Sequence, residues 1–401
     1  MESLGNDHDK INVLICSTGM VSIPPIKGGA IESYINDLCT MFGNDSKVDV
    51  TVVSNVRYDS YMNEFSNIHF VPSKSPVDDF PLTLVQGAFA HVMGGFLTSF
   101  VSRKQLTSFS KNDEVVVHIN EEVNLSFLSV FLKNTPTVFT LHNPPPLLSS
   151  NHLPFFQKNF RKISSKLTIL PLIKLHGEVI SINPAMNKWF IDNGIEKERI
   201  HHIPLPVDTT KFTDSKNGEH AASDYMLFVG RLDSRKDPIG LVRELKDLIT
   251  NNIKLVIVGD GPLRGPLQKY IVGHHLEKRI SLYSRITERQ LIDMYQGARF
   301  LIFPSHLEAY PRAVIEAASC GLPIVMQNLS IYDEFTKNDF TQTYDNSNND
   351  GLKNAVLSFV DDENLLRRKS ANARKYVLNN ASYEVVRLRT EEVYRKAINE
   401  R

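Results

Sequence analysis

Two glutamates, Glu308 and Glu316, lie in the stretch SHLEAYPRAVIEAASCGLP with seven residues between them. An apolar, strand-like run at residues 299–303 precedes this stretch, and the small residues around Glu316 favour a helix that ends near Gly321. Glu308 is therefore predicted in a loop at the carboxyl end of a strand, and Glu316 inside the helix that follows. In open α/β sheets, that end of the sheet is where ligands bind.

A pair of acids at this spacing is compatible with more than one chemistry. Carboxylates can hold sugar or ribose hydroxyls through bidentate hydrogen bonds, or they can serve as acid and nucleophile in a glycosidase. Three other interpretations need no ligand: a surface charge, an acid near a helix N-terminus, or an ion pair with Arg312. The pair alone does not decide among them.

Two cations, Arg231 and Lys236, occur in the segment GRLDSRKD directly after another predicted strand. Arg with its planar fork and Lys as a point charge can clamp a diphosphate. Local ion pairing with Asp233 and Asp237 in the same turn is the alternative. The glycine-containing loop at residues 259–262 would let a nucleotide approach the backbone closely, although plain turns share this signal.

A glycine pair, Gly28 and Gly29, follows the first predicted strand at residues 11–16 and precedes a helical pattern at residues 30–42. A strand, a glycine loop and a helix in this order can bind phosphate, because backbone amides at the helix N-terminus face the loop. The GxGxxG dinucleotide pattern is absent, and a tight turn without a ligand explains the glycines about as well.

The composition of the 401-residue chain excludes several classes of protein. It has 45 basic and 45 acidic residues, which argues against nucleic acid as the main partner. Its three cysteines show no metal-binding spacing and favour a reducing compartment. No HExxH motif and no cluster of Cys and His occur, so no metal is expected. The absence of a GxSxG elbow argues against a Ser-His-Asp hydrolase. Because the first ten residues are polar rather than basic and then apolar, we expect no signal peptide and a cytoplasmic protein.

Two segments bear on membrane contact. Residues 80–102 carry no Asp, Glu, Lys or Arg, and we favour a buried helix with its following loop over a lipid-facing or acceptor-facing element. Residues 157–176 carry five basic side chains among apolar ones. For this second segment a solvated helix face is favoured over a site for an anionic acceptor or an anionic membrane surface.

Strand patterns recur in both halves of the chain, alternating with helical or loop segments. The predicted strands are at residues 11–16, 48–53, 68–71, 115–119, 137–141, 179–182 and 200–203, and then at 226–229, 254–258, 280–283, 299–303, 324–326 and 341–344. A connector rich in Pro, Asp, Ser, Lys and Gly separates the two sets at residues 203–224, and residues 352–401 are predicted to be largely helical. This alternation predicts an α/β protein with two doubly wound domains.

The combination of motifs resembles glycosyltransferase family four, the large retaining family with the GT-B fold. The residues that carry the resemblance are Gly230-Arg231 with Lys236, the loop Gly259-Asp260-Gly261-Pro262, Pro304-Ser305 leading to Glu308 and Glu316, Gly28-Gly29, and Thr140-Leu141-His142. Ile203-Pro204 with Val207-Asp208 and Phe212 is similar to the family's IPNGVD connector, although Leu205-Pro206 replaces the usual Asn-Gly. The resemblance covers the chain from Ile11 onwards and implies two Rossmann-like domains that face a central cleft.

The same resemblance implies a division of labour between domains. Residues 11–204 would bind the acceptor, residues 205–380 would bind the nucleotide sugar, and the last helix at residues 381–401 would cross back to the first domain. The implied reaction is the transfer of a sugar from a nucleotide sugar with retention of configuration. A UDP-sugar is favoured over a GDP- or ADP-sugar, and no metal or other cofactor is required. The acceptor would be a polysaccharide, a lipid-linked sugar or a small metabolite such as an aminoglycoside, with peripheral membrane contact left open. A GT-B epimerase, a phosphorylase or a non-catalytic structural protein are the alternatives.

The resemblance also implies roles for single residues. Arg231 and Lys236 would bind the donor diphosphate, and Glu316 would bind the ribose hydroxyls. Glu308 would contact the donor sugar, and His142 would lie beside the anomeric carbon, so His142, Glu308, Arg231 and Lys236 form the expected catalytic set. The leaving phosphate would assist deprotonation of the acceptor on the same face. Further expected donor contacts are Gly28, Gly29, Gly230, Gly259, Gly261, Arg285, Ile286, Ala309, Tyr310, Pro311 and Arg312.

This chain departs from the family pattern at three places. Ala309 to Arg312 replace a segment in which the family commonly has Gly after the glutamate. Arg285 stands where Gly is common, and an unusual Asn-Pro-Pro-Pro segment follows His142. No specific sugar is therefore carried over from the family.

Overall fold

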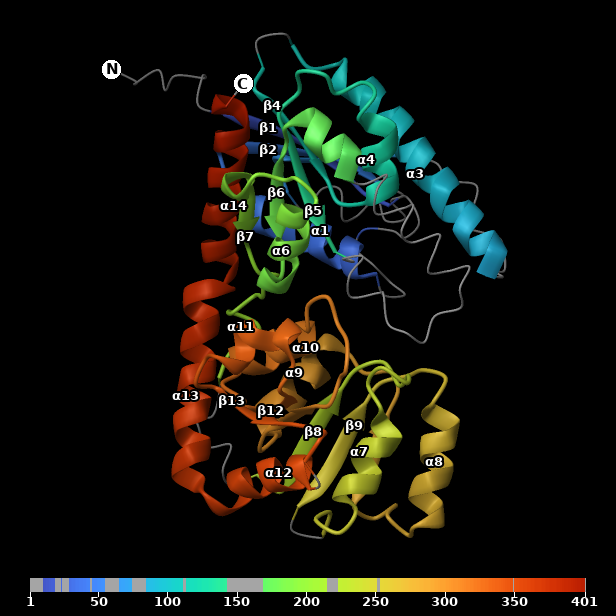
Figure 1. Ribbon diagram of the computed structural model, residues 1–401, viewed down its shortest axis with the longest axis vertical. Helices are drawn as coiled ribbons and strands as arrows, with labels where there is room; N and C mark the ends of the chain where they lie inside the picture. Colours follow the sequence, from blue (N-terminus) through green and yellow to red (C-terminus); the bar gives the residue numbers. More distant parts are fainter. Residues whose placement is uncertain are drawn as a thin grey trace. The chain divides into compact units, whose positions relative to one another are not determined.

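The computed structural model describes residues 10–18, 23, 29–43, 45–54, 65–73, 84–110, 113–142, 169–214, 223–250, 253–348 and 350–400, and within 84–93 it describes the backbone alone. Gly28, the Pro-rich segment after His142 and the basic residues up to 168 lie outside this description. The chain divides into two compact units, labelled by element in Figure 1. Unit 1 comprises Met1–Pro206 and Val386–Arg401, and unit 2 comprises Val207–Val385.

Unit 1 is built on a seven-stranded parallel sheet in the order β3-β2-β1-β4-β5-β6-β7. Its strands are β1 (Ile11–Cys16), β2 (Val48–Ser54), β3 (Ile68–Pro72), β4 (Val115–Ile119), β5 (Thr137–Leu141), β6 (Glu178–Ser181) and β7 (Ile200–His202). The strand order reverses between β1 and β4, which is the switch point of a doubly wound sheet. Strand β1 is buried because it is an apolar run with neighbours on both sides.

The helices of unit 1 cover this sheet. They are α1 (Ala30–Phe42), α3 (Leu84–Leu106), α4 (Glu122–Leu128), α6 (Asn187–Asp192) and α14 (Tyr383–Asn399), and residues 169–175 are also helical. Glu121 caps α4, because its carboxylate accepts hydrogen bonds from the backbone N–H groups of Val123 at 2.8 Å and Asn124 at 3.1 Å. Among the described residues, no helix combines the length and the apolar character needed to span a membrane.

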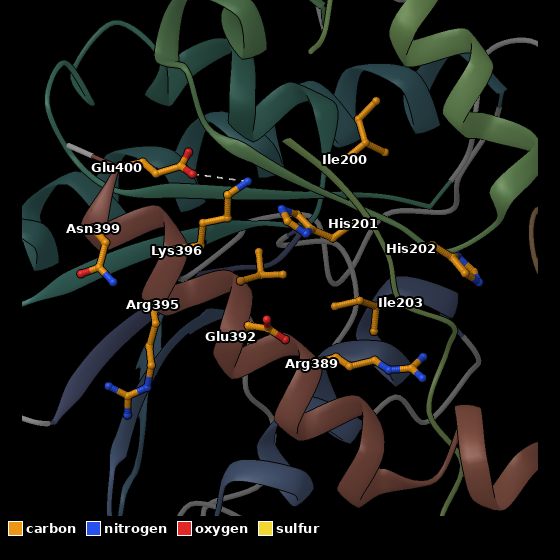
Figure 2. Close-up of a pocket in the computed structure, with 11 residues that line it drawn as sticks. Ile200, His201, His202, Ile203, Arg389, Glu392, Arg395, Lys396, Asn399 and Glu400 are labelled. Atoms are coloured by element: carbon orange, nitrogen blue, oxygen red, sulfur yellow. Dashed lines mark ion pairs between the residues drawn. The ribbon is translucent and has the colours of Figure 1, made fainter. Parts of the chain in front are cut away.

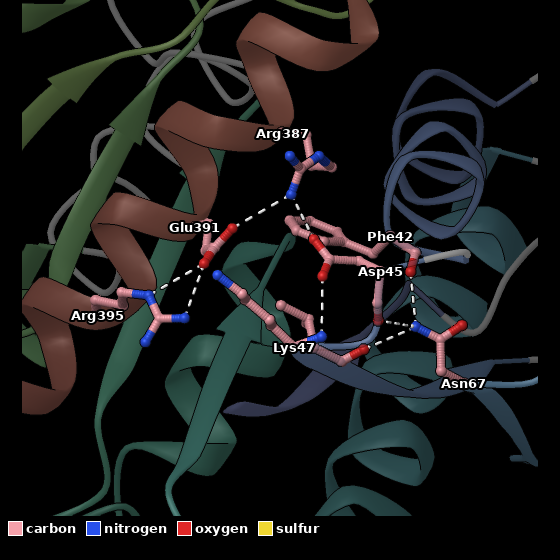
Figure 3. A network of polar contacts seen from close by, with 8 residues as sticks. Phe42, Asp45, Lys47, Asn67, Arg387, Glu391 and Arg395 are labelled. Atoms are coloured by element: carbon pink, nitrogen blue, oxygen red, sulfur yellow. Dashed lines mark hydrogen bonds and ion pairs between the residues drawn. The ribbon is translucent and has the colours of Figure 1, made fainter. Parts of the chain in front are cut away.

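Charged side chains attach the C-terminal helix α14 to unit 1 (Figure 3). Arg387 forms ion pairs with Asp45 and, at 3.3 Å, with Glu391, whose other oxygen lies 2.8 Å from Arg395. Next to this network, the side-chain nitrogen of Asn67 lies 2.7–2.8 Å from the carbonyl oxygens of Phe42, Asp45 and Val48, which share its two N–H groups. The network ties the end of the chain to the loop that precedes β2.

A polar hollow of about 730 Å³ lies farther along α14, between this helix and β7 (Figure 2). At its inner side the Lys396 ammonium lies 3.1 Å from a carboxylate oxygen of Glu178, and His201 pairs with the same oxygen. Burial raises the pKa of Glu178, but the hydrogen bonds from His201 and Lys396 outweigh it and hold the pKa below its usual value. These contacts fix the last turns of α14 against the edge of the sheet.

Unit 2 contains a six-stranded parallel sheet in the order β10-β9-β8-β11-β12-β13. Its strands are β8 (Tyr225–Val229), β9 (Lys254–Val258), β10 (Ile280–Tyr283), β11 (Leu301–Phe303), β12 (Ile324–Gln327) and β13 (Thr341–Tyr344). Its helices are α7 (Pro238–Leu245), α8 (Arg264–Gly273), α9 (Glu288–Gly297), α10 (Arg312–Ser319), α11 (Asp333–Thr336), α12 (Gly351–Asp361) and α13 (Glu363–Asn380). The predicted fold class, two parallel doubly wound sheets with helices, is confirmed.

The register of the unit 2 sheet places the predicted site loops at one edge. Val229 pairs with Val258, and Val258 pairs with Tyr283, so β8, β9 and β10 end together. Phe303 ends β11, and the chain then passes through Glu308 into α10, which contains Glu316 as predicted. Gly321 has φ 71°, immediately after the helix C-cap, and glycine adopts this left-handed conformation without strain.

Candidate functional site

The most buried cation at the unit 2 edge is paired with one of the two predicted acids. Lys236 forms an ion pair with Glu308, and the two side chains are 8% and 23% exposed. The Lys236 ammonium also lies 4.5 Å from the ring centroid of Phe303, the last residue of β11. Burial lowers the pKa of Lys236, and the neighbouring Glu308 carboxylate raises it in part. The pair joins the loop after β8 to the loop after β11.

The turn that presents Lys236 is held by its own polar groups. Asp237 has φ 40° and caps α7, since its side chain accepts a hydrogen bond from the Gly240 N–H at 3.0 Å. Asp233 accepts from the backbone N–H groups of Arg235 at 3.1 Å and Lys236 at 3.4 Å. The residues after the predicted strand therefore form a compact turn whose conformation fixes the position of the lysine.

The local ion pairing anticipated for this turn is present, but its main partner is Arg235. The Arg235 guanidinium lies 2.7 Å from Asp233, whereas Arg231 is 3.8 Å from the same carboxylate. The Arg231 side chain is 69% exposed. The Arg231 side chain thus lies at the surface, and its described ion-pair partner is Asp233.

The glycines of the loop after β9 are required by the neighbouring loop. A Cβ atom at Gly259 would lie 1.9 Å from the carbonyl oxygen of Gly230, and one at Gly261 would lie 2.4 Å from that of Leu232. Backbone hydrogen bonds from Leu232 to Asp260 at 2.9 Å and from Gly230 to Val258 at 3.0 Å close the two loops against each other. These glycines therefore permit the close packing of the two loops, and the approach of a nucleotide to this backbone stays a prediction.

Glu316 lies inside α10 with its carboxylate held on both oxygens. Arg312 donates to one oxygen at 3.0 Å, and the Tyr295 hydroxyl donates to the other at 3.1 Å. The side chain is 12% exposed. The ion pair with Arg312 that was considered as an alternative is thus present, and it fixes the direction of the carboxylate.

The segment between the two acids turns its aromatic residue inward. Tyr310 is 6% exposed, and its ring packs edge-on against Phe335 at 5.4 Å between centroids. Burial raises the pKa of Tyr310 well above its ordinary value. Pro311 directly precedes the first turn of α10, so backbone N–H groups of this helix face the same edge. The Tyr310 ring is therefore part of the core, and within this segment the Arg312 N–H donates to the Tyr310 carbonyl oxygen at 3.1 Å.

Arg285 and Ile286 occupy the loop between β10 and α9 at the same edge. Arg285 is exposed and Ile286 is half-buried. Thr287 then caps α9 in a reciprocal capping box with Gln290.

In unit 1, His142 directly follows β5 and is buried. Its Nε2 donates to the side-chain oxygen of Asn120 at 3.3 Å, and its ring lies edge-on to Tyr34 at 4.9 Å between centroids. Burial lowers the pKa of His142 to about 3, so its imidazole is neutral at pH 7. A small cavity of about 60 Å³ adjoins His142 and Asn120.

A second buried histidine, His118, lies beside His142 in unit 1. Its ring nitrogens bond to Tyr394 on α14 and to Thr140, each at 2.8 Å. Burial and, to a lesser extent, the neighbouring His142 together lower the pKa of His118 to about 3. Both imidazoles are therefore neutral at pH 7.

Gly29 precedes α1 with φ 151°, where a Cβ atom would lie 2.5 Å from a carboxylate oxygen of Glu32. The buried Glu32 accepts a hydrogen bond from the Thr18 hydroxyl. The first turn of α1 itself therefore requires this glycine, whereas its predicted partner Gly28 lies outside the described residues.

Four contributors to these arrangements were missed in the sequence. They are Arg235, Tyr295, Phe303 and Asn120, which contact Asp233, Glu316, Lys236 and His142. Phe303 and Asn120 carried a usable signal, since one ends and the other directly follows a predicted strand. Tyr295 and Arg235 carried no such signal. A tyrosine in a helix and a further basic residue in a charged turn are common in any sequence.

Two family models together match most of the chain. The model described as glycosyl transferases group 1 matches residues 210–376, and the model described as glycosyltransferase family 4 matches residues 31–211. Among curated proteins, the Escherichia coli UDP-Gal:alpha-D-GlcNAc-diphosphoundecaprenol alpha-1,3-galactosyltransferase is 27% identical over 299 residues, which cover 71% of this chain and 75% of the relative.

Solved structures share the whole fold at low sequence identity. Sucrose-phosphate synthase from Thermosynechococcus elongatus has a TM-score of 0.76 at 16% identity, covering 98% of this chain and 100% of that one. HepE from Anabaena, solved in complex with UDP and glucose, has a TM-score of 0.68 at 16% identity, covering 96% of this chain and 99% of that one.

Proposed function

The chain belongs to the GT-B glycosyltransferases of family 4 and group 1, and we propose that it transfers a sugar from UDP to a lipid-linked acceptor with retention of configuration. The observation that carries the donor part is the buried Lys236–Glu308 pair beside the exposed Arg231 at the carboxyl edge of the unit 2 sheet. UDP is favoured because the E. coli relative is named for a UDP-sugar and HepE was solved with UDP.

In the proposed reaction the sugar–phosphate bond breaks and a glycosidic bond forms to the acceptor oxygen. UDP leaves with an extra negative charge on its terminal phosphate, and Arg231 and Lys236 stabilise that charge. The leaving phosphate oxygen takes the proton of the acceptor hydroxyl on the same face. The N-terminal amides of α10 supply further hydrogen bonds to phosphate or sugar.

The two glutamates take different parts in this proposal. Glu308 contacts the transferred sugar, and before donor binding it keeps Lys236 from being a buried, unpaired charge. Glu316 binds the ribose hydroxyls, with its carboxylate already oriented by Arg312 and Tyr295. His142 serves as a neutral hydrogen-bonding group for the transferred sugar, because burial lowers its pKa to about 3. No metal or other cofactor takes part.

The acceptor is the second half of the proposal, and we assign its binding to unit 1. The E. coli relative is named for an acceptor on diphosphoundecaprenol, which supports a lipid-linked sugar here and contact of the protein with a membrane surface. A polysaccharide or a small metabolite acceptor would leave the donor chemistry unchanged.

Calorimetry with UDP, GDP and ADP tests the donor site directly. We expect UDP to bind the full chain, and Arg231→Ala or Lys236→Ala to weaken its affinity at least about tenfold, equivalent to about 1.4 kcal/mol. Arg243→Ala is the matched control, since Arg243 is an exposed arginine on α7 of the same unit. Unchanged UDP affinity in both site variants would refute the diphosphate clamp.

Hydrolysis assays with a panel of UDP-, GDP- and ADP-sugars then test turnover. Slow nucleoside-diphosphate release with a UDP-sugar supports transfer chemistry. Binding of none of these donors would favour a protein that keeps the fold without the reaction.

A further inference from the structure

The outer face of α3 carries phenylalanines, whereas its inner face carries small polar side chains. Phe96 and Phe100 are 44% and 61% exposed. Thr98, Ser99 and Ser102, in the same turns, are buried. A helix on the surface of a globular protein normally has the opposite arrangement, with its apolar stripe facing the core.

Specific contacts fix this orientation of α3. The Thr98 hydroxyl lies 3.1 Å from the side-chain oxygen of Asn124 on α4, and Ser102 accepts a hydrogen bond from the Cys16 thiol of β1 at 3.2 Å. Gly95 packs so closely on α4 that a Cβ atom there would lie 2.6 Å from Val123. A rotation that buried the phenyl rings would break these contacts and would not fit beside α4.

The end of α4 extends the apolar surface of α3. Val130 and Phe131, just after α4, are 62% and 48% exposed, and Phe96 stacks edge-on with Phe127 at 5.3 Å between centroids. Figure 1 shows α3 beside α4 in unit 1. We call Phe96, Phe100, Val130 and Phe131 the α3 patch. Contiguous exposed side chains of this kind mark interaction sites more often than isolated ones do.

Basic groups border the α3 patch. The Arg103 guanidinium lies 4.1 Å from the ring centroid of Phe131, and both Arg103 and Lys104 are exposed. Lys133, two residues after Phe131, is exposed as well. Helix α3 contains no Asp or Glu from Leu84 to Leu106. Aromatic side chains next to Lys and Arg suit the boundary between lipid headgroups and acyl chains, and the positive charge is complementary to anionic lipids.

We propose that the α3 patch docks unit 1 on an anionic phospholipid surface. The phenyl rings enter the headgroup boundary, and Arg103 and Lys104 contact lipid phosphates. The role of this docking, to bring the enzyme to a lipid-linked acceptor, rests on the proposed function. The docking itself rests on the exposure and charge of the patch.

Flotation of the full chain with lipid vesicles tests the proposal. We expect co-flotation with vesicles of phosphatidylcholine and phosphatidylglycerol, and weak flotation with phosphatidylcholine alone. The double variant Phe96→Ser, Phe100→Ser should lower the partition coefficient about tenfold or more, because two large apolar side chains no longer enter the interface. Leu378→Ser is the control, since Leu378 is 43% exposed on α13 of unit 2.

The charged part of the surface has its own variant. Arg103→Gln with Lys104→Gln should lower partition onto phosphatidylglycerol vesicles about thirtyfold, since each basic residue near an anionic surface contributes about 1 kcal/mol. Lys269→Gln with Lys278→Gln in unit 2, both exposed, should change nothing. Circular dichroism and thermal unfolding establish that each variant is folded.

Three results would overturn the proposal. The native chain fails to float with either vesicle, the phenylalanine variant floats like the native chain, or the native chain is a dimer that this variant converts to a monomer. The last result would assign the patch to a second copy of the chain. UDP-sugar hydrolysis measured on the same samples separates the two proposals. Hydrolysis without flotation refutes the docking surface alone, and flotation without hydrolysis refutes the proposed function alone.

Discussion

Each unit has a buried titratable side chain at the carboxyl edge of its sheet, but the side chain is part of an ion pair in one unit and neutral in the other. In unit 2, Lys236 is accompanied by the Glu308 carboxylate and the face of Phe303. In unit 1, the described hydrogen-bond partner of His142 is an amide, Asn120, and burial lowers the pKa of the imidazole to about 3. One edge keeps a compensated ion pair, and the other keeps a neutral polar group.

This difference fits the two halves of a glycosyl transfer. A diphosphate is highly charged, so its site needs cations, and a buried cation needs a temporary counter-ion while the site is empty. Sugar and acceptor hydroxyls are neutral, so a neutral donor or acceptor of hydrogen bonds binds them without a charge to compensate. The two edges therefore differ in what happens when one side chain is changed.

The largest effect is expected from Lys236→Ala. In the proposed reaction, loss of the ammonium removes a contact to the leaving phosphate. It also leaves the half-buried Glu308 carboxylate without its partner, so kcat/KM should fall about a hundredfold to a thousandfold. The control is Lys254→Ala, which breaks the pair with Asp224 at 2.6 Å in the same unit, where both side chains are about half exposed. Steady-state kinetics with a UDP-sugar measure the effect, and equal losses in the two variants would contradict the distinction between them.

Glu308→Gln and Glu316→Gln should separate turnover from binding. Glu308→Gln should lower kcat about a hundredfold, because an amide interacts with the reacting sugar and with Lys236 without a charge. Glu316→Gln should mainly weaken UDP binding, about tenfold, because its proposed contacts are to ribose hydroxyls. Tyr295→Phe tests whether orientation of the Glu316 carboxylate matters, and a smaller loss of affinity is expected. If both glutamine variants changed kcat alone, the division of labour would be wrong.

Unit 1 should lose stability as the pH falls below 6.5, the ordinary pKa of histidine. His118 and His142 have pKa values of about 3 in the folded chain, so between pH 6.5 and 3 the unfolded state binds more protons and acid favours unfolding. Each histidine contributes up to about 1.4 kcal/mol per pH unit in that range. Fluorescence of Trp189, the only tryptophan of the chain, reports on unit 1 in denaturant titrations.

The matched variants for this pH dependence are His142→Gln and His118→Gln. Each removes one titrating group, so the slope of unfolding free energy against pH between 6.5 and 4.5 should shrink. A slope equal to that of the native chain in both variants would show that other groups cause the acid sensitivity.

The sequence was most informative where local signals agree with the fold. The predicted strands at residues 254–258, 280–283 and 341–344 match β9, β10 and β13, because apolar runs between turn residues leave little freedom. The predicted strand at residues 299–303 is shorter in the structure, which starts β11 at Leu301. Arg299 instead directs its side chain to the carbonyl oxygen of Val360 at 3.0 Å, a contact with the end of α12 that no local pattern encodes.

Partners distant in sequence were the part that could not be predicted. The motifs pointed to Lys236 and Glu308 singly, but their pairing depends on the strand order that brings β8 beside β11. The uncharged segment at residues 80–102 was favoured as a buried helix, yet α3 exposes Phe96 and Phe100. Which face of α3 is buried depends on small residues such as Gly95 that pack on α4, and this packing is not visible in one sequence.

The smallest effect is expected from a change that makes the unit 1 edge resemble the unit 2 edge. Asn120→Asp would place a carboxylate beside His142 and raise the pKa of the imidazole, as an acid neighbour favours its charged form. If the pKa of His142 in the folded chain is closer to 6.5, the folded and unfolded states differ less in the number of protons they bind. The slope of unfolding free energy against pH should therefore fall, but by less than the contribution of one histidine. Asn120→Ala is the control, because it adds no carboxylate beside His142 and should keep the native slope. An Asn120→Asp slope equal to that of Asn120→Ala would mean that the protonation of His142 is set by burial alone, whatever group lies beside it.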